Sequence, residues 1–374
     1  MAINAVVPHE FPWLDTSRYS FSPAIEASGA TWAAGQTAGV FDDDTGRIVV
    51  AGDAGEQASL CWEKVSAVLA AADRTPADSS ELVEYVTPAG LADHESVVGA
   101  RPTGASTAAT STVVVDSLVR PEAMVEIEVV AGQPPGLVRI PQVLPIDTEG
   151  AVVAPGDFVG QCEWVLEEAG RRLAARGLSL SDVVKVVQQT TPATRRQYGD
   201  TGEARRRLLA PEFPSSTGVL VSALPHPEAL VALDVWASSE PKQVVQYATD
   251  AYASLTFSPA VSAGGLVFIS GTTAWDPATN DTIAPGDIAA QAEYIYDQIA
   301  QVCTAAGTSI DRLIKTIEYV APEGLERYRE VGGIRERVLG RPFPASTGVV
   351  VAGLLSRKWM IEVEAVALLG ESTS

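Results

Sequence analysis

Cysteine, histidine and long apolar runs are scarce in this chain of 374 residues. It has three cysteines and three histidines, and His9, His94 and His226 do not share a metal-binding spacing. The chain also lacks a Gly-rich phosphate loop and an apolar run long enough to cross a bilayer, and Met1–Pro12 does not read as a signal peptide. We therefore expect no metal, no cofactor, no membrane partner and a cytoplasmic protein.

Basic side chains are also in the minority. Acidic residues outnumber basic ones by 47 to 26, which gives a net charge of −21 at pH 7. Such a charge repels a phosphate backbone unless a local basic patch outweighs it. The densest basic cluster, Arg195–Arg196 with Arg205–Arg207, is typical of a solvated helix face. The expected partner is a small-molecule substrate and not a nucleic acid.

What the chain has instead is repetition. Ala154–Asp157 recurs as Ala284–Asp287, and Pro214–Val219 recurs as a similar segment at 344–349, both 130 positions later. A constant offset over such a span means that the middle and last thirds align without a gap.

The first third repeats the last one less closely. Glu84–Leu91 matches Glu318–Leu325 at an offset of 234, and Val125–Glu128 matches the segment at 361–364 at an offset of 236. We predict three copies, with a Ser- and Pro-containing linker at 238–242. Their expected bounds are 16–132 (first segment), 133–239 (second segment, degenerate) and 247–370 (third segment).

Each copy predicts the same order of elements: strand, turn, strand, helix, strand, helix, strand. In the third segment Asp287 is a plausible helix cap, and apolar residues follow it at spacings of three and four. They are Ile288, Ala292, Ile295, Ile299 and Cys303. The same stripe recurs in the other segments and contains Cys61 and Cys162, so we expect buried free thiols.

The last strand of the third segment, at 359–368, places Glu362 and Glu364 on one face. Glu126 stands at the place in the first segment that corresponds to Glu362. Acids on a strand face are commonly solvated, but at an interface desolvation raises the pKa of such a carboxyl.

The third segment resembles the Rid family (reactive intermediate deaminases, also called L-PSP endoribonucleases) along nearly its whole length, and the other two look like more diverged members. The resemblance rests on motifs in a common order. They are Phe257–Val261, Val267–Gly271, Asp276–Thr279, Ala289–Ala292, Lys315–Thr316, Phe343–Ala345 and Ile361–Ala367. It implies an α+β fold, in which each copy has a mixed sheet backed by two helices.

The resemblance also implies an assembly. Rid proteins form homotrimers around a central β-barrel, with ligand clefts between neighbours. Three copies in one chain then look like an intramolecular pseudo-trimer with three unequal clefts. We expect a monomer of this kind, and further self-association stays open.

The chain departs from the family in two ways. The Arg that grips a substrate carboxylate in deaminating members is replaced by Ser346, Ser216 and Thr110, so amino-acid-derived imines are expected to be poor substrates. The second segment has Ala232 in place of the glutamate and Gln188–Gln189 in place of a Glu-Tyr pair.

These comparisons indicate a hydrolase that adds water to an unsaturated C–N centre in an interdomain cleft. Glu362 is the expected general acid or base, and Ser346, Thr347 and the Gly348 amide are expected to receive oxyanion charge. Ser270 and Gly271 are expected to line the mouth. The remaining candidates are Glu126, Glu318 and Glu84 for catalysis, and Tyr319, Tyr85, Ser216 and Thr217 for substrate binding.

Two alternatives stay open. The chain also resembles chorismatases, which lack the Arg and carry a Glu matching Glu362 that protonates an enol ether; Arg341 and Arg357 are candidates to hold a dicarboxylate. The other alternative is a ligand-binding pseudo-trimer without chemistry. Local capping or packing also accounts for Glu84, Glu318 and the adjacent tyrosines.

Overall fold

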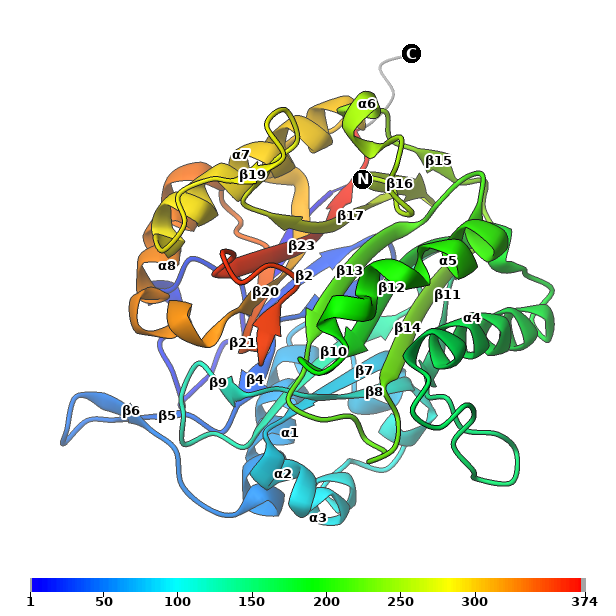
Figure 1. The fold of residues 1–374 in the computed structure, drawn as a ribbon. Coiled ribbons are helices and arrows are strands. Elements are labelled where there is room, and N and C mark those ends of the chain that lie inside the picture. The colour runs from blue at the N-terminus through cyan, green and yellow to red at the C-terminus, as the bar shows by residue number, and fades with distance from the viewer. Residues whose placement is uncertain (1, 371–374) are drawn as a thin grey trace.

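The computed structural model describes residues 2–370 as three mixed sheets with helices around them (Figure 1). In each of the three segments a long helix follows the first strands. Next come a strand, a second helical stretch, a strand parallel to the previous one and a final antiparallel strand. The arrangement is α+β, as expected, but in the second segment a single strand precedes the long helix. None of the described helices has the length and apolar character that spanning a membrane requires.

The first sheet runs in the order β1-β2-β3-β10-β7-β8, with β4 beside β10. Its strands are β1 (Asn4–Val6), β2 (Ala24–Ala27), β3 (Ala30–Ala33), β4 (Gln36–Thr37), β7 (Ser79–Val86), β8 (Ala109–Val114) and β10 (Val125–Gly132). Its helices are α1 (Ala54–Ala70), α2 (Pro88–Ala92) and α3 (His94–Gly99). A separate hairpin consists of β5 (Val40–Asp42) and β6 (Arg47–Val49).

The second and third sheets repeat this plan in the orders β11-β14-β12-β13-β22 and β15-β16-β17-β23-β20-β21-β9. The second comprises β11 (Leu137–Val143), β12 (Val183–Thr190), β13 (Ser215–Leu220) and β14 (Val231–Ser238), with α4 (Phe158–Ala174) and α5 (Gly202–Leu209). The third comprises β15 (Gln243–Val244), β16 (Ala260–Ala263), β17 (Leu266–Thr273), β20 (Leu313–Val320), β21 (Ala345–Val350) and β23 (Ile361–Leu368). Its helices are α6 (Thr249–Tyr252), α7 (Ile288–Ala305) and α8 (Arg329–Val338), and β18 (Trp275–Asp276) pairs with β19 (Asp281–Thr282).

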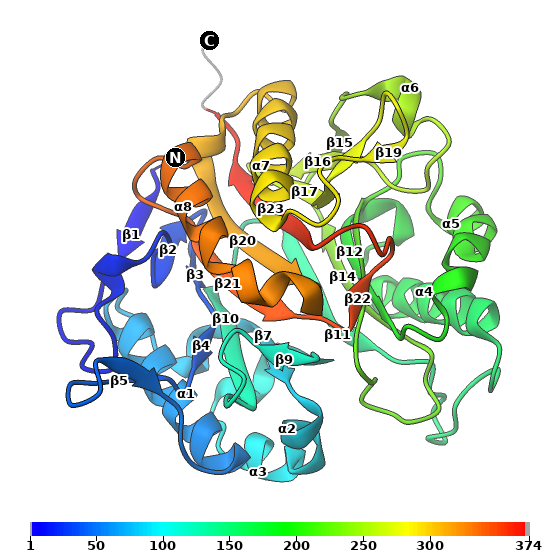
Figure 2. The ribbon, with the colours of Figure 1, turned by 60° about the vertical axis from the view of Figure 1, so that its left-hand side comes forward.

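The long helices lie at the periphery and the sheets face one another at the centre (Figures 1 and 2). The predicted stripe of α7 is buried against the third sheet, and Cys61, Cys162 and Cys303 are buried free thiols, as expected. A separate apolar cluster joins the inner faces of all three sheets through Trp32, Trp236 and Phe268. The alternation of strand residues thus separates a core under each helix from a shared central core.

Short strands tie the segments together in a cycle. From the first segment, β9 (Ser117–Leu118) pairs with β21 of the third, and β22 (Gly353–Leu354) of the third pairs with β13 of the second. A single bridge, Val114 with Ala223, joins the second segment to the first. These contacts do not extend into a continuous ladder, and no closed barrel is found in residues 2–370. The expected central β-barrel is corrected to three separate sheets whose side chains fill the centre.

Candidate functional site

A cavity of about 640 Å³ opens between the second and third segments. We call it the Glu362 cleft. Its polar wall includes Glu362, Gly271, Ser216 and Arg205. The lining also includes aromatic side chains, among them Tyr198, Tyr252, Phe257, Trp275 and Trp359. A few polar groups within a mostly apolar concave surface are typical of a small-molecule site.

Glu362 is held against the backbone of the neighbouring strand. It lies on β23 opposite Thr273 of β17, and a Cβ built on Gly271 would fall 1.9 Å from Glu362 Oε1. The side chain is 4% exposed, and Oε2 has no hydrogen-bond partner among the described residues. Burial, reinforced by the charge of Glu364, raises the pKa of Glu362 to about 8, although a backbone hydrogen bond from Gly218 opposes this shift. Glu362 is therefore largely protonated at neutral pH and suited to donate a proton.

The opposite wall comes from β13 of the second segment. The Ser216 amide donates to Ser270 Oγ at 2.8 Å, and the Gly271 amide donates to Thr217 Oγ1 at 3.1 Å. Ser270 and Thr217 therefore fasten the two strands together, while Ser216 and Gly271 face the cavity. A Cβ on Gly218 would lie 2.3 Å from the hydroxyl of Tyr198, so this glycine makes room for the tyrosine.

Arg205 of α5 contacts Ser216 at the wall of the cavity. Its Nη1 and Nη2 donate to Ser216 Oγ at 3.2 and 3.3 Å, and Nη2 also donates to Gln188 Oε1 at 3.2 Å. Arg206 and Arg207 are exposed, but Arg205 is 3% exposed, so the interpretation of this cluster as a solvated face is wrong for Arg205. The predicted candidates Arg341 and Arg357 are exposed and do not line the cavity.

An equivalent site joins the third and first segments around Glu126. A Cβ on Gly35 would fall 2.0 Å from Glu126 Oε1, and the Gly35 amide donates to Thr347 Oγ1 at 2.9 Å. Burial, with the charge of Glu128, raises the pKa of Glu126 to about 8, against the influence of Lys315. The two acids thus share one design, in which glycine lets a carboxyl lie against backbone.

The partnership expected within the third segment is corrected by this geometry. Glu362 does not face Ser346, Thr347 and Gly348 of its own segment. It faces 216–218 of the second segment, while 346–348 lie in the site of Glu126. The reason is that each Ser-Thr strand is the outermost strand that its own segment contributes to the sheet, and it meets the next segment there, as the bridges Ser215 to Ser258 and Ala345 to Ser22 show.

Glu318 and Glu84 are engaged in ion pairs. Glu318 accepts hydrogen bonds from Arg335 at 2.9 Å and from Tyr296 and Tyr328 at 2.5 Å each. Glu84 accepts two from Arg101 at 2.7 Å and has His94 at 3.3 Å. Burial alone would raise the pKa of Glu84, but His94 and Arg101 outweigh it and lower the pKa. Both acids are saturated with donors, which favours the capping and pairing alternative for them.

Tyr85 and Tyr319 lie away from the clefts. They line a small central cavity of about 50 Å³ and belong to a cluster that all three segments share. The tyrosines that reach the sites are instead Tyr198 and Tyr328, each next to the glycine of a Ser-Thr-Gly strand. Sequence reasoning missed them, although they recur at the same offset of 130 as the strands they contact.

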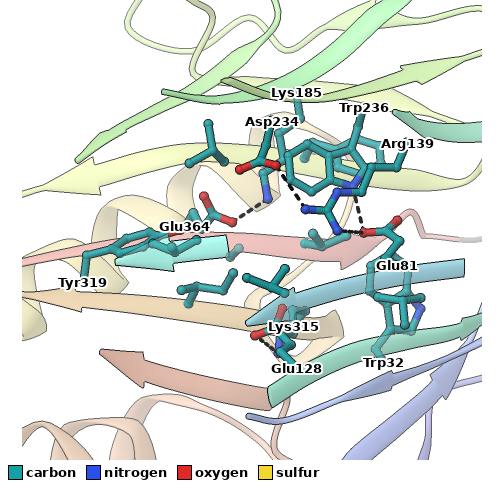
Figure 3. Close-up of a pocket in the computed structure, with 18 of the residues that line it drawn as sticks. Trp32, Glu81, Glu128, Arg139, Lys185, Asp234, Trp236, Lys315, Tyr319 and Glu364 are labelled. Atoms are coloured by element: carbon teal, nitrogen blue, oxygen red, sulfur yellow. Dashed lines mark hydrogen bonds and ion pairs between the residues drawn. The ribbon is translucent and has the colours of Figure 1, made fainter. Parts of the chain in front are cut away.

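The central cavity carries three clusters of buried charge (Figure 3). Lys315 lies 2.8 Å from Glu128, and Lys185 pairs with Glu364. At the third junction, Arg139 lies 3.2 Å from Asp234 and 3.8 Å from Glu81. Each cluster joins residues of two segments, so buried electrostatics help to fix how the segments dock.

The junction of the first and second segments lacks the glutamate site. In the second segment Val143 pairs with Leu233, and in the third Thr272 pairs with the equivalent residue, Val363. Val143 and Thr272 are therefore equivalent positions. The residue before each one is Gln142 in the second segment and Gly271 in the third, so Gln142 occupies the place of Gly271. The place of Glu362 is taken by Ala232. Gln142 donates to Thr112 O at 3.2 Å and to Gln189 Oε1 at 3.1 Å, so its amide is satisfied internally.

Comparison with known proteins gives three findings. The sequence profile of the endoribonuclease L-PSP family matches residues 15–133 and 248–369. A RutC family protein of Pyrococcus horikoshii is 31% identical over 30% of this chain and 85% of its own length. The chloroplastic Reactive Intermediate Deaminase A of Arabidopsis thaliana is 30% identical over 37% of this chain and 72% of its own.

A structural likeness extends further along the chain. A chorismatase crystal structure is similar over 78% of this chain and 93% of its own, with a TM-score of 0.51 and 14% sequence identity. At this identity the likeness concerns the fold. The covered share is larger than that of the family profile, which leaves residues 134–247 unmatched.

Proposed function

Because this chain belongs to the endoribonuclease L-PSP family, we propose that it is a small-molecule hydrolase that adds water to an enamine or imine in the Glu362 cleft. The observation that carries the proposal is a buried carboxyl, protonated near neutral pH, on the wall of a cavity of about 640 Å³. The net charge of −21 favours a small molecule over RNA. A cytoplasmic location remains a prediction.

In the proposed reaction Glu362 donates its proton to the β-carbon of an enamine and leaves an iminium. Water adds to the iminium carbon and returns one proton to the Glu362 carboxylate. The new hydroxyl then passes its proton to nitrogen as ammonia leaves and the carbonyl forms. One water is consumed, one ammonia is released and Glu362 is protonated again. The Ser216 hydroxyl, oriented by Arg205, donates a hydrogen bond to the oxygen of the added water as that oxygen becomes the carbonyl.

We further propose that the three segments form a pseudo-trimer with one open cleft. Repeated strand orders and the cyclic exchange of β9 and β22 support a threefold plan. The second segment has Ala232 in place of the cleft glutamate, yet its strand β13 completes the site of Glu362. Fusion of the segments thus lets one site combine parts that have diverged.

The test measures ammonia release from a panel of enamines, imines and cyclic amides. Wild type is expected to hydrolyse at least one, and Glu362→Gln to lose that activity without a fall in Tm. Glu126→Gln is the matched control, because it removes an equivalent buried carboxyl outside the cavity of the Glu362 cleft. Equal rates in wild type and Glu362→Gln would refute the assigned role. Binding without turnover would instead establish the non-catalytic alternative.

A second candidate is hydrolysis of an enol ether. The specific observation in its favour is the chorismatase-like fold over 78% of the chain, together with a neutral carboxyl able to protonate carbon. Chorismate belongs in the same panel. Consumption of chorismate that depends on Glu362, with no ammonia released from the nitrogen compounds, would decide for this candidate.

A further inference from the structure

The three segments place a guanidinium beside the same strand position, buried for Arg205 and Arg335 and half-buried for Arg101, but they compensate its charge differently. Arg101 lies 2.7 Å from Glu84, and Arg335 lies 2.9 Å from Glu318. The register of β7, β12 and β20 against their antiparallel partners shows that Gln188 is the equivalent residue in the second segment. There the guanidinium meets the Gln188 amide oxygen and the Ser216 hydroxyl in place of a carboxylate.

Arg205 is consequently a buried cation without an acid. Among residues 2–370 no carboxylate forms an ion pair with it, and its Nε has no hydrogen-bond partner. A buried charge without a counter-ion is costly, and an unpaired buried donor adds to that cost. The arrangement is explained if a ligand supplies the missing negative charge.

The surroundings fit a small organic anion. Arg205 and Ser216 line the same cavity as Glu362, which contributes no negative charge while it is protonated. Asp281, also in the lining, is paired with Lys358 at 3.0 Å. Arg206 also reaches the lining but is exposed to solvent, whereas the planar guanidinium of Arg205 is buried and matches the geometry of a carboxylate.

We propose that Arg205 is the anion-binding residue of the Glu362 cleft and that the ligand of this cleft carries a carboxylate. Because Ser216 replaces the Arg of deaminating Rid proteins, the sequence predicted poor binding of a substrate carboxylate. This expectation is revised, since Arg205 of α5 supplies a guanidinium next to Ser216. That the carboxylate lies next to the reacting C–N or C–O double bond rests on the proposed function, whereas the anion site itself does not.

The test uses benzoate and its neutral analogue benzamide as probes in titration calorimetry on the full chain. Benzoate is expected to bind wild type at least ten times more tightly than benzamide. Gln188→Glu recreates the Arg-Glu pair of the other segments, so it is expected to weaken benzoate binding at least tenfold without lowering the Tm. Gln188→Met, which adds no charge, is the matched control and is expected to retain binding.

A second variant keeps the test decisive if Gln188→Glu does not fold. Arg205→Gln is expected to lose benzoate selectivity, and Arg335→Gln, which alters the equivalent residue of the third segment, is expected to keep it. Undiminished benzoate binding in Gln188→Glu, or no preference for benzoate over benzamide in wild type, would overturn the proposal. Selective benzoate binding without hydrolysis of any compound would refute the proposed function alone. Turnover that depends on Glu362 without benzoate selectivity would refute only the anion site.

Discussion

Gly271 lies so close to Glu362 that a Cβ on the glycine would fall 1.9 Å from Oε1. We predict that Gly271→Ala displaces the carboxyl by about an ångström and lowers kcat by roughly 100-fold, since misplacement on this scale is that costly. Steady-state rates, with Tm as a check on folding, measure the effect. Gly35→Ala makes the same change beside Glu126 and is expected to leave the rate intact; equal losses in both variants would contradict a single active cleft.

The protonation state of Glu362 predicts a pH profile. Since its pKa is about 8, the protonated form prevails at pH 7 and is lost as pH rises through 8. kcat/KM for the substrate found in the panel is therefore expected to fall about tenfold for each pH unit above 8. A rate that rises over pH 7–9 would show that the carboxylate, and not the acid, is the working form.

The two buried glutamates also predict how stability depends on pH. Glu126 and Glu362 have a pKa of about 8 when folded and an ordinary value of 4.5. The native state holds protons that the unfolded chain releases, so their contribution to stability is full below pH 4.5 and is lost as pH rises to 8. Each carboxyl contributes a slope of up to about 1.4 kcal/mol per pH unit in that window.

Glutamine variants isolate this contribution. Glu126→Gln and Glu362→Gln are expected to match wild type in urea unfolding near pH 4.5 and to exceed its stability at pH 9 by a few kcal/mol (~1.4 kcal/mol per pH unit). Because the two sites lie in different clefts, the double variant is expected to be additive. Variants that keep the wild-type difference between pH 4.5 and pH 9 would show that these carboxyls ionise normally when folded.

Periodicity and repetition predict much of this fold, but not the partners across segments. The spacing of Ile288, Ile295 and Cys303 fixes which face of α7 is buried, and alternation on β23 places Glu362 and Glu364 on the inner face. Both signals are local. Which strand faces Glu362 depends on how separate sheets dock, and no spacing within one segment encodes that. Arg205 carried a usable signal, since it recurs 130 positions later as Arg335.

Arg139 illustrates how docking is specified by charge. Strand register shows that Arg139 of the second sheet is equivalent to Trp32 of the first and Phe268 of the third. By the same comparison, Glu81 of the first sheet is equivalent to Lys185 of the second and Lys315 of the third. Glu81 and Asp234 would repel one another without the guanidinium between them (Figure 3). The Trp236 indole also donates to Glu81 at 2.9 Å.

We therefore predict that Arg139→Phe alone lowers the free energy of unfolding by about 3–5 kcal/mol, because it leaves two buried acids without a cation. Adding Glu81→Lys places a lysine and an aromatic residue beside Asp234, which is the pattern of the other two junctions. The double variant is therefore expected to recover most of the lost stability. Urea unfolding of the two single variants and the double variant measures the coupling. If the effects simply add, the pairing across this junction does not determine how the first and second segments dock.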